Sequence, residues 1–254
     1  MTRLLQLFRL GVVRQFLSWS GAWWFVVALA AGQILPPLIG LAVWRTVFPG
    51  SAQVSTYYLA LLFTVATTAS YENHTFSQGI YKGTLADELV KPQPVIMLPL
   101  SENVAVRAWI GLVAVPVIVL VGAMLTVPFE PGALLVALPF WLGAGLLRFL
   151  FTWCLAMTAF WSERVHAITA FGTTTLYLLG GNAVPINLLP SFWGDLARLL
   201  PFYSMLGLPA DAAAGQAVQA GTAAIVQIGW LVLLGLAART LWLRGLRRFT
   251  AVGG

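Results

Sequence analysis

Six apolar stretches divide the chain, and each has about the length that a membrane-crossing helix requires. Roughly 20 apolar residues in helical conformation cross the bilayer core. The stretches cover residues 23–44, 57–75, 104–127, 132–160, 166–184 and 216–238. The second and the fifth are the least regular, because both contain several threonines and end in polar residues. The pattern predicts an all-α, polytopic membrane protein with six transmembrane helices, in a single domain over residues 1–254.

Composition supports a membrane protein independently of this pattern. Of the 254 residues, 59% are hydrophobic and 9% are charged, whereas soluble domains carry about 25% charged residues. So little polar surface cannot cover a water-facing globule of this size. The net charge is +6, but the basic residues flank the apolar stretches. We therefore expect contact with lipid headgroups and no binding of nucleic acid.

The basic residues are distributed unequally between the two sides of the predicted membrane. Lys and Arg are enriched in cytoplasmic segments of membrane proteins. If the N-terminus is cytoplasmic, only Arg45 and Arg198 lie outside, and Arg148 lies within a span. The inner segments and span ends then hold Arg3, Arg9, Arg14, Lys82, Lys91, Arg107, Arg164, Arg239, Arg244, Arg247 and Arg248. Both termini are predicted to be cytoplasmic.

Residues 1–20 form the first segment outside the spans, with a moderately amphipathic helical pattern. One arc of the helix is basic and polar, with Arg3, Gln6, Arg9 and Arg14. The opposite arc is apolar, with Leu4, Leu5, Phe8, Val12 and Phe16. The pattern predicts an interfacial helix in the inner leaflet. The alternative is a positively charged topology anchor.

The long internal connection, residues 77–103, contains a second predicted element. Its sequence reads SQGIYKGTLADELVKPQPVIMLPLSEN. Residues 84–89 favour a short helix, with Thr84 as its cap and Asp87 and Glu88 in the first turn. Pro92 then follows Lys91 and ends the helix. Such a helix suits docking into a groove of a soluble partner, and the alternative is a polar loop without a docking role.

The long external connection, residues 180–209, is too apolar for a free loop and too rich in proline for a span. Residues 190–200 favour a short helix with Ser191 as its cap. Its predicted apolar face consists of Phe192, Trp193, Leu196, Leu199 and Leu200. We expect this segment to re-enter the outer leaflet, where backbone outside helices must be covered by protein or line an aqueous cavity.

These three segments, in this order, resemble the type-2 permease family of ABC transporters, and its bacterial six-span branch in particular. The internal loop carries Gly79-Ile80-x-x-Gly83-x-Leu85-x-x-x-Leu89-x-Lys91-Pro92. The external segment carries Gly180 through Pro185-Ile186, then Leu189-Pro190-x-x-Trp193, Leu200-Pro201-Phe202 and Pro209. The chain closes on Arg247-Arg248-Phe249 and Gly253-Gly254.

The resemblance implies a fold, a location and partners. Residues 78–98 would form a cytoplasmic coupling loop and residues 185–209 an external re-entrant hairpin, in the cytoplasmic (inner) membrane of a bacterium. A second permease chain, identical or different, and two cytoplasmic ABC ATPase subunits would complete an exporter. The ATPase-coupling residues would be Gly79, Lys82, Gly83, Leu85, Asp87, Glu88, Leu89, Lys91 and Pro92. Those of the hairpin would be Pro185, Pro190, Trp193, Pro201 and Phe202.

Several polar residues within the spans are candidates for a transport pathway. Thr64, Thr68 and Glu72 repeat at four-residue spacing and share one helix face, with Tyr71 adjacent. The stripe could line a pathway or an interface, or it could supply hydrogen bonds that pack the bundle. The fifth span carries a similar polar patch that includes Thr174 and Tyr177.

Arg148 is the one basic residue predicted in the middle of a span, with Gly145 and Thr152 on its face. An unpaired arginine there costs at least about 2.5–3.5 kcal/mol. We expect it to pair with a carboxylate, for which Glu72 and Glu163 are candidates, or with carbonyls at a helix end. Both a structural role and a contact with cargo stay open.

The sequence carries no motif for chemistry of its own. It has no Gly-x-x-x-x-Gly-Lys-Ser/Thr loop, so ATP and Mg²⁺ are expected in a partner ATPase. It also lacks a Gly-x-Ser-x-Gly or His-Glu-x-x-His motif, and His74 and His166 have no metal ligands at suitable spacing. We expect no catalytic, cofactor or metal site.

Three function classes compete, and the first is an ATP-driven exporter permease. The second is a secondary transporter of a small amphipathic substrate, driven by an ion gradient. That class typically shows inverted repeats and broken helices near the midplane, and the sequence indicates neither. The third is a lipid-modifying enzyme, for which the acidic residues are too scattered. The modest polar stripes favour a hydrophobic or amphipathic cargo such as a drug, lipid or peptide.

Overall fold

The computed structural model describes residues 2–127, 130–162 and 164–249, and helices make up 82% of it. No strand occurs in these ranges, which confirms the all-α prediction. The helices are α1 (Thr2–Ser20), α2 (Trp23–Val47), α3 (Ala52–Thr67), α4 (Glu72–Tyr81), α5 (Leu85–Leu89), α6 (Met97–Leu125), α7 (Pro131–Met157), η1 (Thr158–Phe160), α8 (Val165–Leu179), η2 (Ile186–Leu188), α9 (Ser191–Leu199), α10 (Pro201–Met205), α11 (Gly207–Ala213) and α12 (Ala220–Leu246).

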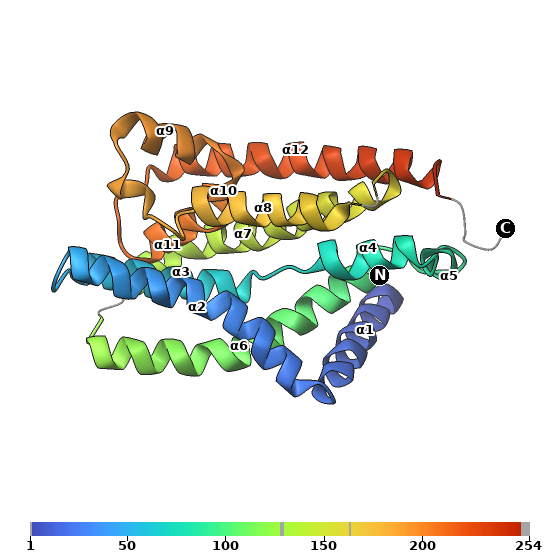
Figure 1. The fold of residues 1–254 in the computed structure, drawn as a ribbon, viewed down its shortest axis with the longest axis horizontal. Coiled ribbons are helices and arrows are strands. Elements are labelled where there is room, and N and C mark those ends of the chain that lie inside the picture. The colour runs from blue at the N-terminus through green and yellow to red at the C-terminus, as the bar shows by residue number, and fades with distance from the viewer. Residues whose placement is uncertain (1, 128–129, 163, 250–254) are drawn as a thin grey trace.

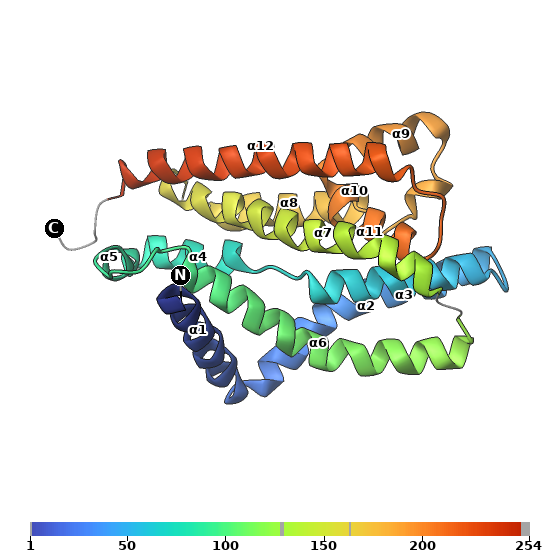
Figure 2. The same ribbon diagram turned by 180° about the vertical axis from the view of Figure 1, so that it is seen from behind.

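The long helices run along the long axis of the molecule, so that it has two distinct ends (Figures 1 and 2). One end holds α5 and the C-terminal end of α12. The other holds α9 and the connection between α2 and α3. This arrangement separates the two predicted functional connections, the coupling loop and the hairpin, by the length of the molecule.

Four helices are long and apolar enough to cross a membrane: α2, α6, α7 with η1, and α12. The prediction of six continuous spans is therefore wrong in two places. The second predicted span is divided into α3, with 16 residues, and α4, with 10 residues. The fifth, α8, has 15 residues and is about 22 Å long, less than the roughly 30 Å core of a bilayer.

Helix α1 lies obliquely beside α6 (Figure 1). The ring of Phe16 stacks on Trp109 of α6 at 4.6 Å, and the Trp109 indole donates a hydrogen bond of 2.9 Å to the Phe16 carbonyl. Phe16 is half-buried, whereas Leu4 and Leu5 of the same predicted apolar arc are exposed. One part of the arc thus packs on the protein, and the other part is free to contact lipid.

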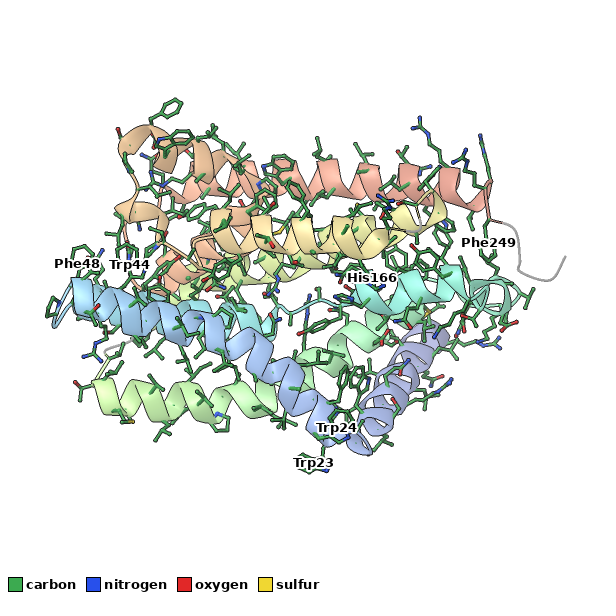
Figure 3. All side chains as sticks on the ribbon, viewed as in Figure 1. Trp23, Trp24, Trp44, Phe48, His166 and Phe249 are labelled. Carbon is green, nitrogen blue, oxygen red and sulfur yellow. The ribbon has the colours of Figure 1, made fainter. Side chains whose placement is uncertain are left out.

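Aromatic side chains mark both ends of α2. Figure 3 shows Trp23 and Trp24 at its start and Trp44 and Phe48 at its far end. Its 25 residues extend about 37 Å, comparable to the distance between the two interfaces of a bilayer. Tryptophan is enriched at these interfaces. Trp44 also donates a hydrogen bond of 3.0 Å to the carbonyl of Ala183, which ties α2 to the segment after α8.

Candidate functional site

The second predicted span is interrupted at residues 68–71, and we call this segment the break. Threonine hydroxyls at the end of α3 bond to its own carbonyls: Thr64 donates to Ala60 at 2.9 Å and Thr68 to Thr64 at 2.5 Å. Such bonds compete with regular helix hydrogen bonds. After Thr64, the last carbonyls of α3 have no partners in their own helix, as at any helix end. They must be satisfied by other elements, because no water reaches a lipid-covered backbone.

Two arginines from neighbouring helices donate to backbone carbonyls at the end of α3 and in the break. Arg148 of α7 donates to the Val65 carbonyl and to the Thr68 hydroxyl, both at 2.9 Å. Arg107 of α6 donates to the carbonyls of Ala69 at 2.9 Å and Gly145 at 2.7 Å. Positive charge is favourable at the C-terminal end of a helix. Arg148 therefore stabilises the end of α3, and Arg107 connects the break to α7.

Glu72 begins α4 on the other side of the break, where a negative charge is favourable. Its carboxylate accepts hydrogen bonds from the Asn103 amide of α6 and from the Thr152 hydroxyl of α7, the second at 2.6 Å. The Asn103 amide also donates to the Ser70 hydroxyl at 3.1 Å. Glu72 thus fixes the start of α4 to two other helices.

Of the two predicted partners of Arg148, a carboxylate or a helix-end carbonyl, the structure shows the second, since Arg148 donates to the Val65 carbonyl. Among the described residues, ion pairs join only Lys91 to Glu88 and Arg198 to Asp195. The predicted ion pair of Arg148 with Glu72 is therefore wrong, and Glu163 lies outside the described residues. The carboxylate of Glu72 is held by uncharged donors instead.

A cavity of about 190 Å³ lies beside the break, between α2, α4, α7 and α8. Gln33 of α2 connects two residues that line this cavity. Its amide donates to the Tyr71 hydroxyl at 3.0 Å, and its carbonyl accepts from Arg148 at 3.4 Å. The polar lining is contributed by Gln33, Ser70, Tyr71, Asn73, His74, Arg148, Thr152, Thr173, Tyr177 and Asn182.

The predicted polar candidates separate into three groups around this cavity. Tyr71, Arg148, Thr152 and Tyr177 line it. Thr64, Thr68 and Glu72 are buried in the packing around the break and do not line it. Thr174 is exposed on α8, outside the lining.

The predicted coupling loop forms the short helix α5 at one end of the molecule (Figure 2). Gly83 precedes it with φ of +74°, a conformation that other residues rarely adopt. Thr84 occupies the N-cap position of α5 as predicted, but its hydroxyl makes no capping bond and donates instead to the Gly79 carbonyl at 3.4 Å. Lys82 and Asp87 are exposed, and so is Pro92.

The two leucines of α5 have opposite environments. Leu85 is 2% exposed and packs in one cluster with Phe76, Ile80 and Trp153. Leu89 is 39% exposed and Val90 85%. Lys91 pairs with Glu88 at 2.5 Å. The apolar surface at this end is therefore offered by Leu89 and Val90, whereas Leu85 anchors α5 to its own chain and cannot contact a partner.

The predicted external hairpin is a compact set of short helices, from η2 to α11. Pro185 and Pro201 are buried, and Phe202 packs edge-on against Phe151 of α7 at 5.8 Å. Helix α9 begins at Ser191, so Pro190, and not Ser191, occupies the cap position. The predicted apolar face of α9, including Trp193, points outward, while Gly194 and Ala197 are buried beneath it.

A comparison with known protein families shows to which family this chain belongs. A family model described as ABC-2 family transporter protein matches residues 50–253. The chain belongs to the ABC-2 transporter family. This confirms, at the level of the family, the resemblance drawn from the sequence, and the match includes the break, α5 and the hairpin. Members of this family are permease subunits that lack a nucleotide-binding domain. No curated protein matches the chain.

One buried acid of this ABC-2 protein was missed by the sequence reasoning. Asp211 of α11 is buried and accepts hydrogen bonds from the Tyr203 hydroxyl at 2.7 Å and the Asn187 amide at 3.0 Å. Arg198 of α9 donates to Asn187 at 2.8 Å. Asp211 thus connects the beginning and end of the hairpin. Its signal was available, since it is an acid within the apolar run LGLPADAAA.

Three other polar residues that contact the break were not predicted to belong to the site. Gln33 lies in an otherwise apolar span, Asn103 was predicted as the last residue of the internal connection, and Arg107 was placed at the inner end of the third span. Their spacing of four residues puts Asn103 and Arg107 on one helix face, which would have indicated a shared target. His74 and His166 were treated as separate, but their rings lie 6.5 Å apart between α4 and α8. The described residues form no group of three potential metal ligands.

Proposed function

We propose that this ABC-2 protein is the permease subunit of an ATP-driven exporter. It would form the translocation pathway with a second permease chain, identical or different, and be driven by two cytoplasmic ABC ATPase subunits that bind ATP and Mg²⁺. One observation carries the proposal: Leu89 and Val90 are exposed at the end of a short helix that Leu85 anchors to its own chain. Because members of this family lack a nucleotide-binding domain, this apolar surface is available to a separate ATPase.

The proposed topology has six crossings, with the coupling loop in the cytoplasm. Helices α3 and α4 would cross together, and α8 would cross with the segment that follows it. The long apolar helices and the gathering of Arg244, Arg247 and Arg248 toward the α5 end support a cytoplasmic position for that end and both termini. The location would be the cytoplasmic membrane of a bacterium.

The proposed pathway runs along the surface between α2 and α8. Thr173, Thr174 and Tyr177 of α8 and His74 of α4 are exposed polar side chains there, which lipid tails would not solvate. A second permease chain would cover this surface. The hairpin from η2 to α11 would close the pathway on the external side.

Co-purification with the ATPase tests the proposal. The chain is expressed in its native cell, captured through a tag, and its partners are identified by mass spectrometry. We expect an ABC ATPase subunit with the unaltered chain and at least a tenfold loss of it in Leu89→Asp with Val90→Asp. Leu188→Asp is the matched control, since Leu188 is 41% exposed but lies in the hairpin, and it should retain the subunit. Retention of the ATPase by the double variant would reject α5 as the coupling helix.

The break is the one observation that favours a secondary transporter instead. Discontinuous helices whose ends face a cavity are typical of ion-gradient-driven carriers. The two functions differ in their energy source, so transport is measured in vesicles with the ATPase inactivated. Transport that then stops supports the exporter, whereas transport that persists and follows an ion gradient supports the alternative.

A further inference from the structure

The cavity beside the break contains buried polar atoms that have no partner. Arg148 is only 7% exposed, and its Nε makes no hydrogen bond. The side-chain oxygens of Asn73 and Asn182 are likewise buried and unpaired. All three residues line the cavity. An unsatisfied buried polar group costs about 1–3 kcal/mol, and more when it is charged, so these atoms point to an occupant.

The charge around the cavity specifies the sign of that occupant. No carboxylate of the described residues pairs with Arg148. The nearest candidate, Glu72, has its two oxygens engaged by Asn103 and Thr152 and does not line the cavity. The carbonyl at the end of α3 offers a partial negative charge only. Arg148 is therefore a buried cation that an anionic group would compensate.

The size and remaining walls of the cavity specify the kind of anion. Its volume of about 190 Å³ lies below the roughly 300–1,000 Å³ of sites that enclose a drug-sized ligand. Apolar walls are supplied by Pro36, Val65, Phe151, Leu176 and Leu206. The exposed Gly32, His74 and Tyr177 show that the cavity opens to the surface between α2 and α8. The space thus suits a polar headgroup whose apolar tail remains outside.

We propose that this cavity binds the phosphate or carboxylate end of an amphipathic molecule. The anionic oxygens accept from Arg148 Nε, a hydroxyl of the same headgroup, such as the P–OH of a singly ionised phosphate, donates to the side-chain oxygens of Asn73 and Asn182, and the tail lies on the apolar surface between α2 and α8. That the bound molecule is cargo rests on the proposed function, but binding itself requires neither ATP nor a partner.

Binding to the full chain, purified in dodecyl maltoside without an ATPase, tests the proposal. Dodecyl phosphate, dodecanol and inorganic phosphate are titrated by isothermal calorimetry. We expect dodecyl phosphate to bind at least tenfold more tightly than dodecanol, and Arg148→Gln to remove most of that preference. Equal affinities for dodecyl phosphate and dodecanol would overturn the proposal. Inorganic phosphate binding as tightly as dodecyl phosphate would retain the anion site but overturn its assignment to amphiphiles.

A second variant keeps the test decisive if Arg148→Gln does not fold. A Cβ atom added at Gly32 meets no atom within 4 Å, and Gly32 lines the cavity, so a leucine should be accommodated there and obstruct the entrance. A Cβ atom at Gly229 on α12 likewise meets no atom within 4 Å, and Gly229 does not line the cavity, so Gly229→Leu is the control. We expect at least a tenfold loss of dodecyl phosphate binding in Gly32→Leu and none in Gly229→Leu. Unchanged binding in Gly32→Leu would overturn the site, while ATPase co-purification would still test the permease function separately.

Discussion

At the scale of single residues, the bundle is organised by polar side chains that face backbone rather than each other. Arg148 donates to a carbonyl at the end of α3, Arg107 donates to a carbonyl of the break, and Glu72 is held by uncharged donors. The sequence predicted that Arg148 needs compensation, and it named the correct class of partner among two. It did not indicate roles for Arg107 and Asn103, because they bond to Ala69 and Ser70. These two residues lie in the break, which the sequence did not predict.

Removing Arg107 should destabilise the folded chain. Arg107→Leu leaves the buried carbonyl of Ala69 without a donor and removes the additional bond to the carbonyl of Gly145 in α7, and an unpaired buried acceptor costs about 1–3 kcal/mol. We expect the melting temperature in detergent to fall by several degrees. Arg239→Leu replaces an exposed arginine on α12 and should leave it nearly unchanged. Equal melting temperatures for both variants would show that the break does not depend on Arg107.

Asp211 should matter more to the hairpin than the neighbouring Asp195. Asp211→Ala removes the acceptor of Tyr203 and Asn187, and we expect a loss of about 1–3 kcal/mol with faster cleavage of residues 185–215 by external protease. Asp195→Ala breaks only an exposed pair with Arg198, worth about 0–1 kcal/mol. Identical proteolysis of the two variants would mean that Asp211 does not hold the hairpin.

At the scale of helices, hydropathy predicted the four long helices and local signals predicted the short ones, whereas the division of the second span depends on contacts with other helices. The predicted helices over residues 84–89 and 190–200 correspond to α5 and α9 within one residue at each end, since Gly and Pro residues delimit them. The second span was predicted as continuous because a hydropathy pattern does not reveal a break that is stabilised by threonine hydroxyls and by arginines of other helices. The burial of Leu85 also could not be read from a loop sequence, since Phe76 and Trp153 cover it only in the fold.

The orientation of α5 should depend on Gly83. Its φ of +74° costs a residue with a side chain about 1–2 kcal/mol, so Gly83→Ala should turn α5 or weaken its packing. We expect severalfold less ATPase in co-purification. Gly111→Ala on α6 meets nothing within 4 Å and should behave as the unaltered chain. A Gly83→Ala variant with full ATPase recovery would show that the approach to α5 is not constrained.

At the scale of the whole molecule, the family match and the two ends of the bundle support one account. The chain is an ABC-2 protein whose predicted coupling helix and hairpin lie at opposite ends (Figure 1). The distribution of basic residues predicted which end is cytoplasmic. The number of crossings did not follow from the pattern alone, because α8 and the divided second span fall short of the length of a full span.

Cross-linking from the exposed tip of α5 tests the central claim, that a separate ATPase engages this end of the molecule. Val90→Cys and Leu188→Cys are made in separate chains, and the one natural cysteine, Cys154, is only half-exposed. Each variant is treated in the native membrane with a bifunctional maleimide, and the product is identified by mass spectrometry. We expect Val90→Cys to link to an ABC ATPase subunit and Leu188→Cys to link to none. A link from Leu188→Cys alone, or reaction of Val90→Cys with an impermeant maleimide outside intact cells, would contradict the account.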